Sequence, residues 1–505
     1  MSFKKNVVAG YVSQLYVTVV GLLILPLYLK YMGAEAYGLV GFFTMLQAWF
    51  NLLDIGFTPT VARETARFRG GAVSALAYRR LLRALQIIFL VVASLGGGAM
   101  FVFSGTIASE WLNAKILSVE QVQQAVQLMA IGAALRWMSG LYRGCISGSE
   151  RLVWLSGFNS FVATLRFVGV LPILMFVGHS PKIFFSYQLL VAMFELIGLV
   201  FKAHSLFPRM SDAEKIGWSL DSLFFPVKSV LKFSLVIAVT SSVWVLITQT
   251  DKLVLSKLLS LTDYGYFTLA VLAASGVMVI AGPISGALLP RMARLHAGGD
   301  EAGLIDIYRN ATQMVAVIAL PVCFVLVFFA EKVLQVWTGD MSIAAHAAPV
   351  LRLYAIGNGF LAFSAFPYYL QYSKGDLRLH FIGSFVFLLL LIPSLIWATW
   401  RYGTVGAGYA WLVSNGMYFM VWVPFVHARV SRGLHRKWLL NDLIPMFLLG
   451  LFAASLLHFF LPWPQERSEM GAVLFLCGAV VFIFCALSSR KMRGIFNIGR
   501  LRLVN

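Results

Sequence analysis

Seven charged side chains within long apolar segments of this sequence are candidates for a functional site. They are Arg136, Arg166, Lys252 and Arg352 among the bases, and Asp54, Glu195 and Asp251 among the acids. A charge at bilayer depth costs from about 2.5 to above 10 kcal/mol, so such a residue faces a cavity or a partner. Because a planar guanidinium group matches two phosphate oxygens, the excess of arginine favours an anionic ligand such as a phosphate ester. We therefore expect Arg136, Arg166, Arg352 and Lys252 to line a cationic, substrate-binding cleft.

The same charges also have structural explanations. Asp54 and Lys252 lie near the ends of their apolar segments, where an ion pair or a side chain reaching the interface explains them equally well. Arg136 and Arg166 lie about fourteen residues inside their segments, which favours a water-filled cavity or a binding role. Arg143 shares a helix face with Arg136 but lies near the inner end, as expected of a topology charge.

The acidic residues are candidates for ion coupling or gating. Asp54, Glu195 and Asp251 could each take up a proton or help to hold Na⁺. For Asp251 we favour simple charge balance with its neighbour Lys252. For Asp54 and Glu195 the sequence leaves both roles open. No bound cofactor is expected beyond a coupling ion, either H⁺ or Na⁺.

Composition indicates the solvent in which the chain folds. Of 505 residues, 60% are hydrophobic and 12% are charged. A soluble domain carries roughly twice that charged fraction, so most of this surface must face lipid. About fourteen segments are long and apolar enough to span a bilayer. They lie near 10–30, 37–58, 82–104, 122–146, 152–178, 183–203, 229–258, 263–290, 310–331, 345–372, 378–400, 405–428, 440–461 and 469–488.

The basic residues predict the orientation. With both termini in the cytoplasm, the inner segments hold 29 of the 40 Lys and Arg residues and the outer linkers hold 7. This is the positive-inside distribution of a multi-pass membrane protein, and it explains the net charge of +19 without nucleic acid. No outer linker is long enough for a catalytic domain, and no Walker-type phosphate loop is present. The four cysteines lack metal-ligand spacing. We expect a transporter with no catalytic residue and no metal site.

The chain matches itself at an offset of 227 residues. Lys30 aligns with Lys257, Tyr37-Gly38 with Tyr264-Gly265, and Arg151-Leu152 with Arg378-Leu379. This predicts two six-span lobes that enter the membrane in the same direction, followed by two further spans. The expected boundaries are 1–204 for the N-terminal lobe, 205–228 for a cytoplasmic linker, 229–430 for the C-terminal lobe, and 431–505 for the last two spans and a basic tail. Two such lobes suit alternating access around a central cleft.

Three stretches resemble the polysaccharide transporters, the O-antigen and capsule flippases of the multidrug/oligosaccharidyl-lipid/polysaccharide (MOP) superfamily. They read LPLYLKYMGAEAYGLVGFFTMLQAWFNLLDIGF at 25–57, RETARFRGG at 63–71 and TDKLVLSKLLSLTDYGYF at 250–267. The resemblance implies a fold like that of the multidrug and toxin extrusion (MATE) proteins. It further implies movement of undecaprenyl-diphosphate-linked oligosaccharides from the cytoplasmic to the outer leaflet of the bacterial inner membrane. The implied partners are that substrate, membrane lipids, a glycan polymerase and chain-length proteins.

One departure from the family concerns the first span. Lipid II flippases carry arginines there, whereas this chain has Ser13, Gln14 and Thr18, which argues against a peptidoglycan precursor. Three other functions stay open. A passive lipid scramblase or a structural partner in a glycan-assembly complex would need no coupling ion. A multidrug or metabolite antiporter of the same superfamily would need a cleft dominated by acids. A membrane glycan polymerase or ligase would need a large outer loop.

Overall fold

The computed structural model describes residues 3–54, 56–208, 220–279 and 281–489. Within these ranges the fold is helical, and helices cover all fourteen predicted spans. Nine helical stretches of the described chain are long and apolar enough to cross a membrane. The protein is therefore a multi-pass membrane protein with the predicted all-helical architecture. Two predicted regions fall partly outside the described residues, namely 209–219 of the linker and 490–505 of the basic tail.

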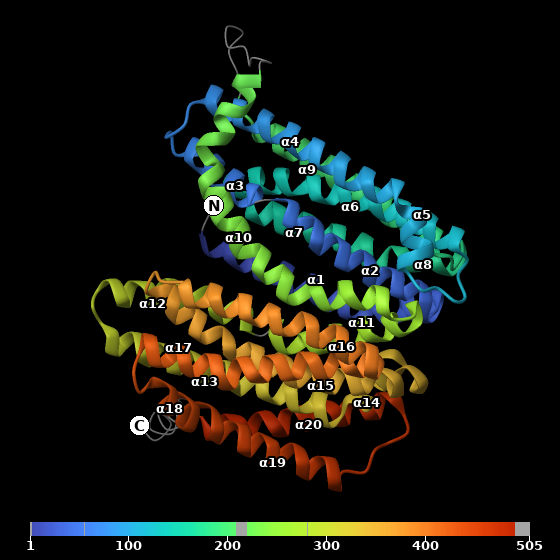
Figure 1. Ribbon diagram of the computed structural model, residues 1–505, viewed down its shortest axis with the longest axis vertical. Coiled ribbons are helices and arrows are strands. Elements are labelled where there is room, and N and C mark those ends of the chain that lie inside the picture. Colours follow the sequence, from blue (N-terminus) through green and yellow to red (C-terminus); the bar gives the residue numbers. More distant parts are fainter. Residues whose placement is uncertain (1–2, 55, 209–219, 280, 490–505) are drawn as a thin grey trace. The chain divides into compact units, whose positions relative to one another are not determined.

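The chain divides into two compact units, residues 1–265 and 266–505, and the division falls within helix α11 (Leu261–Val279). The elements of the first unit, shown in blue to green in Figure 1, are α1 (Phe3–Met32), α2 (Ala34–Phe50), η1 (Asn51–Asp54), α3 (Phe57–Arg69), α4 (Ala75–Val102), α5 (Ser104–Thr106), η2 (Ile107–Trp111), α6 (Val119–Gly148), α7 (Leu152–Ala163), η3 (Thr164–Val168), α8 (Val170–Phe176), α9 (Pro181–Leu206) and α10 (Leu220–Leu258). Helix α6 is its centre, packed against α4 and α9, and the three helices run alongside one another (Figure 1).

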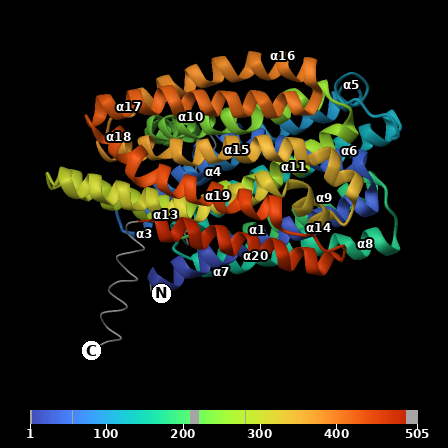
Figure 2. The same ribbon diagram turned by 90° about the horizontal axis from the view of Figure 1, so that it is seen from below.

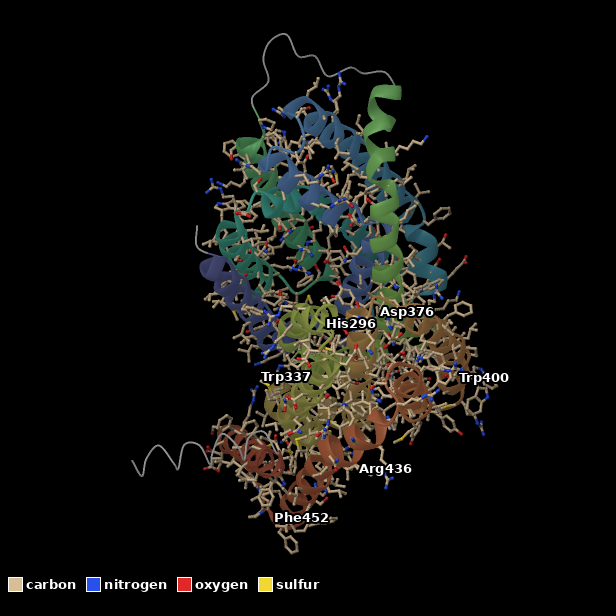
Figure 3. The ribbon with its side chains drawn as sticks, turned by 90° about the vertical axis from the view of Figure 1, so that its left-hand side faces the viewer. His296, Trp337, Asp376, Trp400, Arg436 and Phe452 are labelled. Atoms are coloured by element: carbon tan, nitrogen blue, oxygen red, sulfur yellow. The ribbon has the colours of Figure 1, made fainter. Side chains whose placement is uncertain are left out.

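The elements of the second unit are α12 (Ala281–Ala297), α13 (Glu301–Phe328), α14 (Ala330–Thr338), α15 (Met341–Ser373), α16 (Arg378–Met417), η4 (Tyr418–Trp422), α17 (Val423–Val430), α18 (Leu434–Trp438), η5 (Leu439–Leu443), α19 (Ile444–Phe460) and α20 (Arg467–Ser488). Helices α19 and α20 pack on each other and on α13 (Figure 2). Large apolar side chains such as Trp400 and Phe452 point away from the bundle (Figure 3), as expected of a surface that faces lipid.

Short polar motifs set the helix ends. Helix α6 begins with a capping box, in which the Ser118 hydroxyl accepts from the Gln121 backbone N–H at 3.2 Å and the Gln121 side chain accepts from the Ser118 N–H at 3.1 Å. Ser180 caps α9 with a single bond, in which its hydroxyl accepts from the Ile183 N–H at 3.3 Å. Within α16, Gly403 adopts a φ of 60°, which divides this long element into the two predicted spans.

The 227-residue repeat is visible in the order of the helices. Helices α2 and α11 begin at Ala34 and Leu261, at the offset itself. Helices α4 and α13 are both 28 residues long and begin within one residue of it. The two halves of the sequence therefore build the same succession of elements.

Two glycines of the repeat meet within the first unit. A Cβ atom on Gly265 would lie 2.6 Å from the carbonyl oxygen of Ala34, and a Cβ atom on Gly38 would overlap the carbonyl oxygen of Leu261. Gly38 aligns with Gly265 and Ala34 with Leu261, so the contact is reciprocal. We call this contact the glycine crossing. It requires glycine because backbone lies against backbone.

Replacing Gly265 by alanine is expected to destabilise the protein by about 1–3 kcal/mol, because the added methyl group must displace main chain. Gly276 provides the control on the same helix, since nothing lies within 4 Å of its Cβ position. Gly276→Ala should be neutral or slightly stabilising, because alanine favours helix. Thermal unfolding of the purified variants in detergent measures both effects. Equal melting temperatures for the two variants would contradict the close backbone contact at Gly265.

The linker before α6 is fastened to the first turn of α2. The buried carboxylate of Glu35 accepts three consecutive backbone N–H groups, from Lys115 at 2.6 Å, Ile116 at 2.9 Å and Leu117 at 2.8 Å. The same linker holds the turn between α10 and α11, because the Leu261 N–H donates to the carbonyl oxygen of Asn113 at 2.9 Å. These bonds fix the end of the first unit at which the glycine crossing lies.

Candidate functional site

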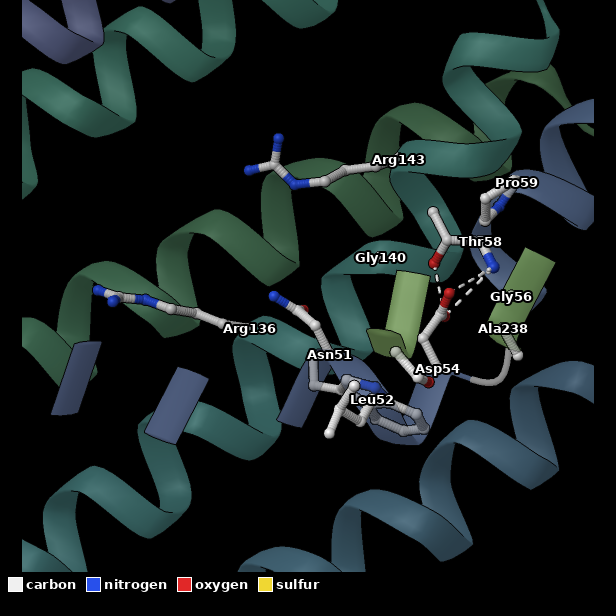
Figure 4. Close-up of a pocket in the computed structure, with 12 residues that line it drawn as sticks. Asn51, Leu52, Asp54, Gly56, Thr58, Pro59, Arg136, Gly140, Arg143 and Ala238 are labelled. Carbon is white, nitrogen blue, oxygen red and sulfur yellow. Dashed lines mark hydrogen bonds between the residues drawn. The ribbon is translucent and has the colours of Figure 1, made fainter. Parts of the chain in front are cut away.

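The first unit contains a cavity of about 430 Å³. Helix α6 and the broken segment between α2 and α3 supply most of its lining. The lining residues are Asn51, Leu52, Asp54, Gly56, Thr58, Pro59, Arg136, Trp137, Gly140, Arg143, Ala238 and Ser242. Arg136 and Arg143 extend from the same side of α6, as their seven-residue spacing predicts (Figure 4).

Arg136 is held by two glutamine side chains. Its Nη1 donates to Oε1 of Gln47 on α2 at 3.2 Å, and its Nη2 donates to Oε1 of Gln188 on α9 at 3.0 Å. The guanidinium carbon also lies 5.3 Å from the centre of the Phe43 ring, a cation–π contact. Both hydrogen-bond partners are neutral amides, so the positive charge of Arg136 is positioned but not cancelled.

Arg166 reaches the same glutamine from another helix. Its Nη2 donates to Gln47 Oε1 at 3.2 Å, so one amide oxygen accepts from both arginines. Arg166 lies in the π-helical turn η3, whose wider hydrogen-bonded ring leaves carbonyl groups for other donors. The Tyr28 hydroxyl donates to the Phe167 carbonyl at 2.8 Å, and Gln188 Nε2 donates to the Arg166 carbonyl at 2.9 Å. These buried side chains fix the turn that presents Arg166.

The arginine pair is bound by neutral groups, and Glu195, whose charge acts on both arginines, is itself paired with Arg143. Neither Arg136 nor Arg166 forms an ion pair with a carboxylate of the described residues. Two buried nitrogen atoms of the group, Arg136 Nε and Gln47 Nε2, also lack a hydrogen-bond partner among those residues. Both atoms are donors, so the site lacks hydrogen-bond acceptors. An anion with several oxygen atoms would supply them.

Two turns further along the same face of α6, the arginine charge is paired with a carboxylate. Arg143 donates to Glu195 on α9 and to Asn159 on α7. Glu195, one of the predicted coupling acids, is therefore an ion-pair partner of Arg143 in this structure. Arg143 itself lines the cavity and is engaged in the protein interior, which differs from its expected role as a topology charge. The spacing in α6 brings it to the same face as Arg136, and α9 supplies the carboxylate.

Asp54 lies where the helical path breaks between η1 and α3. Its carboxylate accepts from the Thr58 hydroxyl at 2.8 Å and from the Thr58 N–H at 3.1 and 3.2 Å (Figure 4). It thereby satisfies one of the free N–H groups at the start of α3. Gly56, with a φ of 70°, makes the break possible. Asp54 shares the cavity with Arg136 and Arg143.

The remaining predicted residues are engaged elsewhere. Lys252 Nζ lies 3.3 Å from Asp251 Oδ1 and donates to the Thr248 carbonyl at 2.6 Å, which is the charge-balanced arrangement favoured from the sequence. Arg352 belongs to the second unit, where it pairs with Glu331 at 3.1 Å. Its side chain is 40% exposed, and its expected place in a substrate-binding cleft stays a prediction. The sequence could not show that pair, because Glu331 precedes it by a full helix.

The chain is similar to known proteins in both sequence and fold. A family model described as polysaccharide biosynthesis protein matches residues 160–342. A Shigella flexneri protein named as an O-antigen transporter is 20% identical over 422 residues, which cover 82% of this chain and 95% of that protein.

Solved structures match over most of the chain. A structure of the lipid II flippase MurJ in an inward closed conformation has a TM-score of 0.71 at 15% identity, covering 96% of this chain and 99% of that one. An inward-facing MATE multidrug-resistance transporter of the MOP superfamily has a TM-score of 0.66 at 15% identity, covering 84% and 96%.

The fold is that of the MOP transporters, as the resemblance implied. The family model and the Shigella flexneri relative show that the chain is similar to polysaccharide transporters, over residues 160–342 and over 82% of the chain respectively. The prediction of a transporter, and not an enzyme, is confirmed by these matches.

Proposed function

We propose that this protein is a flippase that moves an oligosaccharide linked to undecaprenyl diphosphate from the cytoplasmic to the outer leaflet, by alternating access. The polysaccharide-transporter relationship supports the sugar, and the arginine pair supports the diphosphate. The single observation that carries the proposal is the convergence of Arg136 and Arg166 on Gln47 without an ion pair to an acid among the described residues. Two adjacent cations in a membrane protein are costly, and a bound dianion offsets that cost.

The distribution of basic residues supports the direction and the location. With 29 Lys and Arg residues on the inner segments, the protein is expected in the bacterial inner membrane with both termini in the cytoplasm. The substrate would then be loaded where its sugars are assembled, next to cytoplasmic donors. A glycan polymerase and chain-length proteins would take up the translocated product.

Transport is proposed to be coupled to H⁺ or Na⁺. We propose that Asp54 links binding of this ion to binding of the substrate. Its carboxylate lines the same cavity as Arg136 and Arg143 and has no basic partner among the described residues. A negative Asp54 would oppose an incoming anion, and its neutralisation by a cation would favour one.

Reconstitution in vesicles tests the function. Fluorescent undecaprenyl-diphosphate oligosaccharide placed in both leaflets should become fully accessible to a membrane-impermeant quencher only in vesicles that contain the protein. Imposed proton and sodium gradients should then identify the coupling ion by changing the rate. A cationic dye serves as the comparison substrate. Accumulation of the dye without movement of the lipid would instead establish the multidrug antiporter.

A further inference from the structure

Two arginine contacts join α6 to α9 at equivalent positions, and we call each contact a rung. The two rungs differ in chemistry. Arg136 on α6 faces Gln188 on α9, and Arg143 on α6 faces Glu195 on α9. Both arginines and both partners are seven residues apart, so each rung joins the same two helix faces two turns further on. One rung has an amide partner and the other a carboxylate. The two rungs are thus a matched pair that differs in charge.

The amide partner has a specific electrostatic consequence. Glutamate has the same length and shape as glutamine, and it would pair with Arg136 as Glu195 pairs with Arg143. Such a pair would cancel the charge and satisfy the guanidinium without a ligand. With glutamine, the guanidinium is oriented by a hydrogen bond while its charge remains available.

Gln47 repeats this arrangement between the two arginines. Its Oε1 accepts a hydrogen bond from Arg136 and another from Arg166. One uncharged amide group therefore holds the two positively charged side chains close together. Its Nε2 is buried without a partner among the described residues and is a further donor for an anion. Gln188 completes the group, since its Nε2 holds the Arg166 carbonyl while its Oε1 holds Arg136.

We propose that Gln47 and Gln188 are specificity-determining residues that keep two positive charges available, so that the site selects an anion with two negative charges over an anion with one. This rests on the proposed function and names its charge requirement. A lipid diphosphate joined to a sugar is a diester with one charge on each phosphate. A lipid monophosphate joined to the same sugar carries a single charge. The site therefore binds the diphosphate lipid more tightly than the monophosphate lipid, because only the diphosphate has a negative charge for each arginine.

The variant Gln188→Glu tests this inference. It should weaken binding of an undecaprenyl-diphosphate sugar by about 10- to 100-fold, as expected when one charge-assisted contact is cancelled. Binding of the matching undecaprenyl-phosphate sugar should fall less, so the preference between the two lipids decreases. In Gln188→Glu the melting temperature should change little, because the new ion pair with Arg136 is offset by loss of the Nε2 hydrogen bond to the Arg166 carbonyl. In Gln47→Glu it should rise, because the carboxylate relieves the repulsion between Arg136 and Arg166 and the lost Nε2 has no partner among the described residues. A purely structural role of Gln188 would move affinity and stability in the same direction. Gln47→Glu should reproduce the effect on binding.

Glu195→Gln is the reciprocal variant on the second rung. It removes the partner of Arg143, so the melting temperature should fall while the preference for the diphosphate lipid is retained or increased. A loss of preference in this variant would contradict the assignment of selectivity to the first rung.

The proposed function and this inference fail differently. If Arg136→Ala and Arg166→Ala lose binding while Gln188→Glu and Gln47→Glu keep it, along with the preference for two charges, the glutamines do not set specificity. If none of the four variants changes binding, the arginine pair is not the headgroup site and the proposed function loses its support. Should Gln188→Glu fail to fold, Gln47→Glu decides alone.

Discussion

Replacing Arg136 and Arg166 together by alanine is expected to abolish detectable translocation of the diphosphate-linked lipid. A buried, hydrogen-bonded charge pair is worth about 2–5 kcal/mol when one partner is removed, so losing even one such contact weakens binding more than tenfold. The double variant removes both positive charges of the pair. We therefore expect a loss of at least 1,000-fold in affinity, roughly 4 kcal/mol.

The same variant should fold at least as well as the natural protein, because two adjacent like charges are removed from the interior. Binding of the labelled lipid to purified protein and its movement in vesicles give the functional readouts, and thermal unfolding gives the stability. Arg378→Ala is the control, since that side chain is 90% exposed and lies in the second unit. Normal transport by the double variant would end the assignment of the headgroup site to this pair.

Replacing Asp442 by alanine is expected to cause the largest loss of stability. This carboxylate is fully buried in the second unit and accepts from Arg309 Nε at 2.6 Å, Arg309 Nη2 at 3.0 Å and Gln313 Nε2 at 2.8 Å. It joins the segment before α19 to α13. Removing this carboxylate costs about 2–5 kcal/mol, because three hydrogen bonds to a buried charge are lost and water compensates Arg309, whose side chain is 25% exposed, only in part.

Asp442→Asn is the matched variant, since it keeps the shape and one acceptor oxygen but loses the charge. Its apparent melting temperature in detergent should lie between those of the natural protein and Asp442→Ala. Equal melting temperatures for all three would mean that Asp442 does not hold α19 against α13. The effect should appear in stability first, because Asp442 is remote in sequence from the arginine pair and belongs to the other unit.

Much of the architecture could be predicted because it depends on local patterns. Apolar runs and their breakers located the spans, and the repeat placed equivalent helices at the same offset. The seven-residue spacing placed Arg136 and Arg143 on one face of α6. These inferences need only the geometry of a helix and the cost of charge in lipid.

The composition of the site could not be predicted in the same way. Gln47 and Gln188 are uncharged residues in apolar helices, so nothing in the sequence singled them out. Arg166 is aimed by a π-helical turn whose carbonyls are held by Tyr28 and Gln188, from two other helices. Such contacts join residues more than twenty positions apart, and no local pattern encodes them. One signal could have pointed to Gln188: it precedes Glu195 by seven residues, the same spacing as that between Arg136 and Arg143.

The glycine crossing has a consequence beyond packing. Each side of it presents the same two positions of the repeat, so the contact is of the kind that two identical molecules make around a two-fold axis. A polypeptide of half this length would carry both surfaces that the contact requires and could meet a second copy of itself there. In the present chain both sides of this contact belong to one polypeptide. A substitution on one side can therefore be compensated by a different substitution on the other, which two identical molecules could not do.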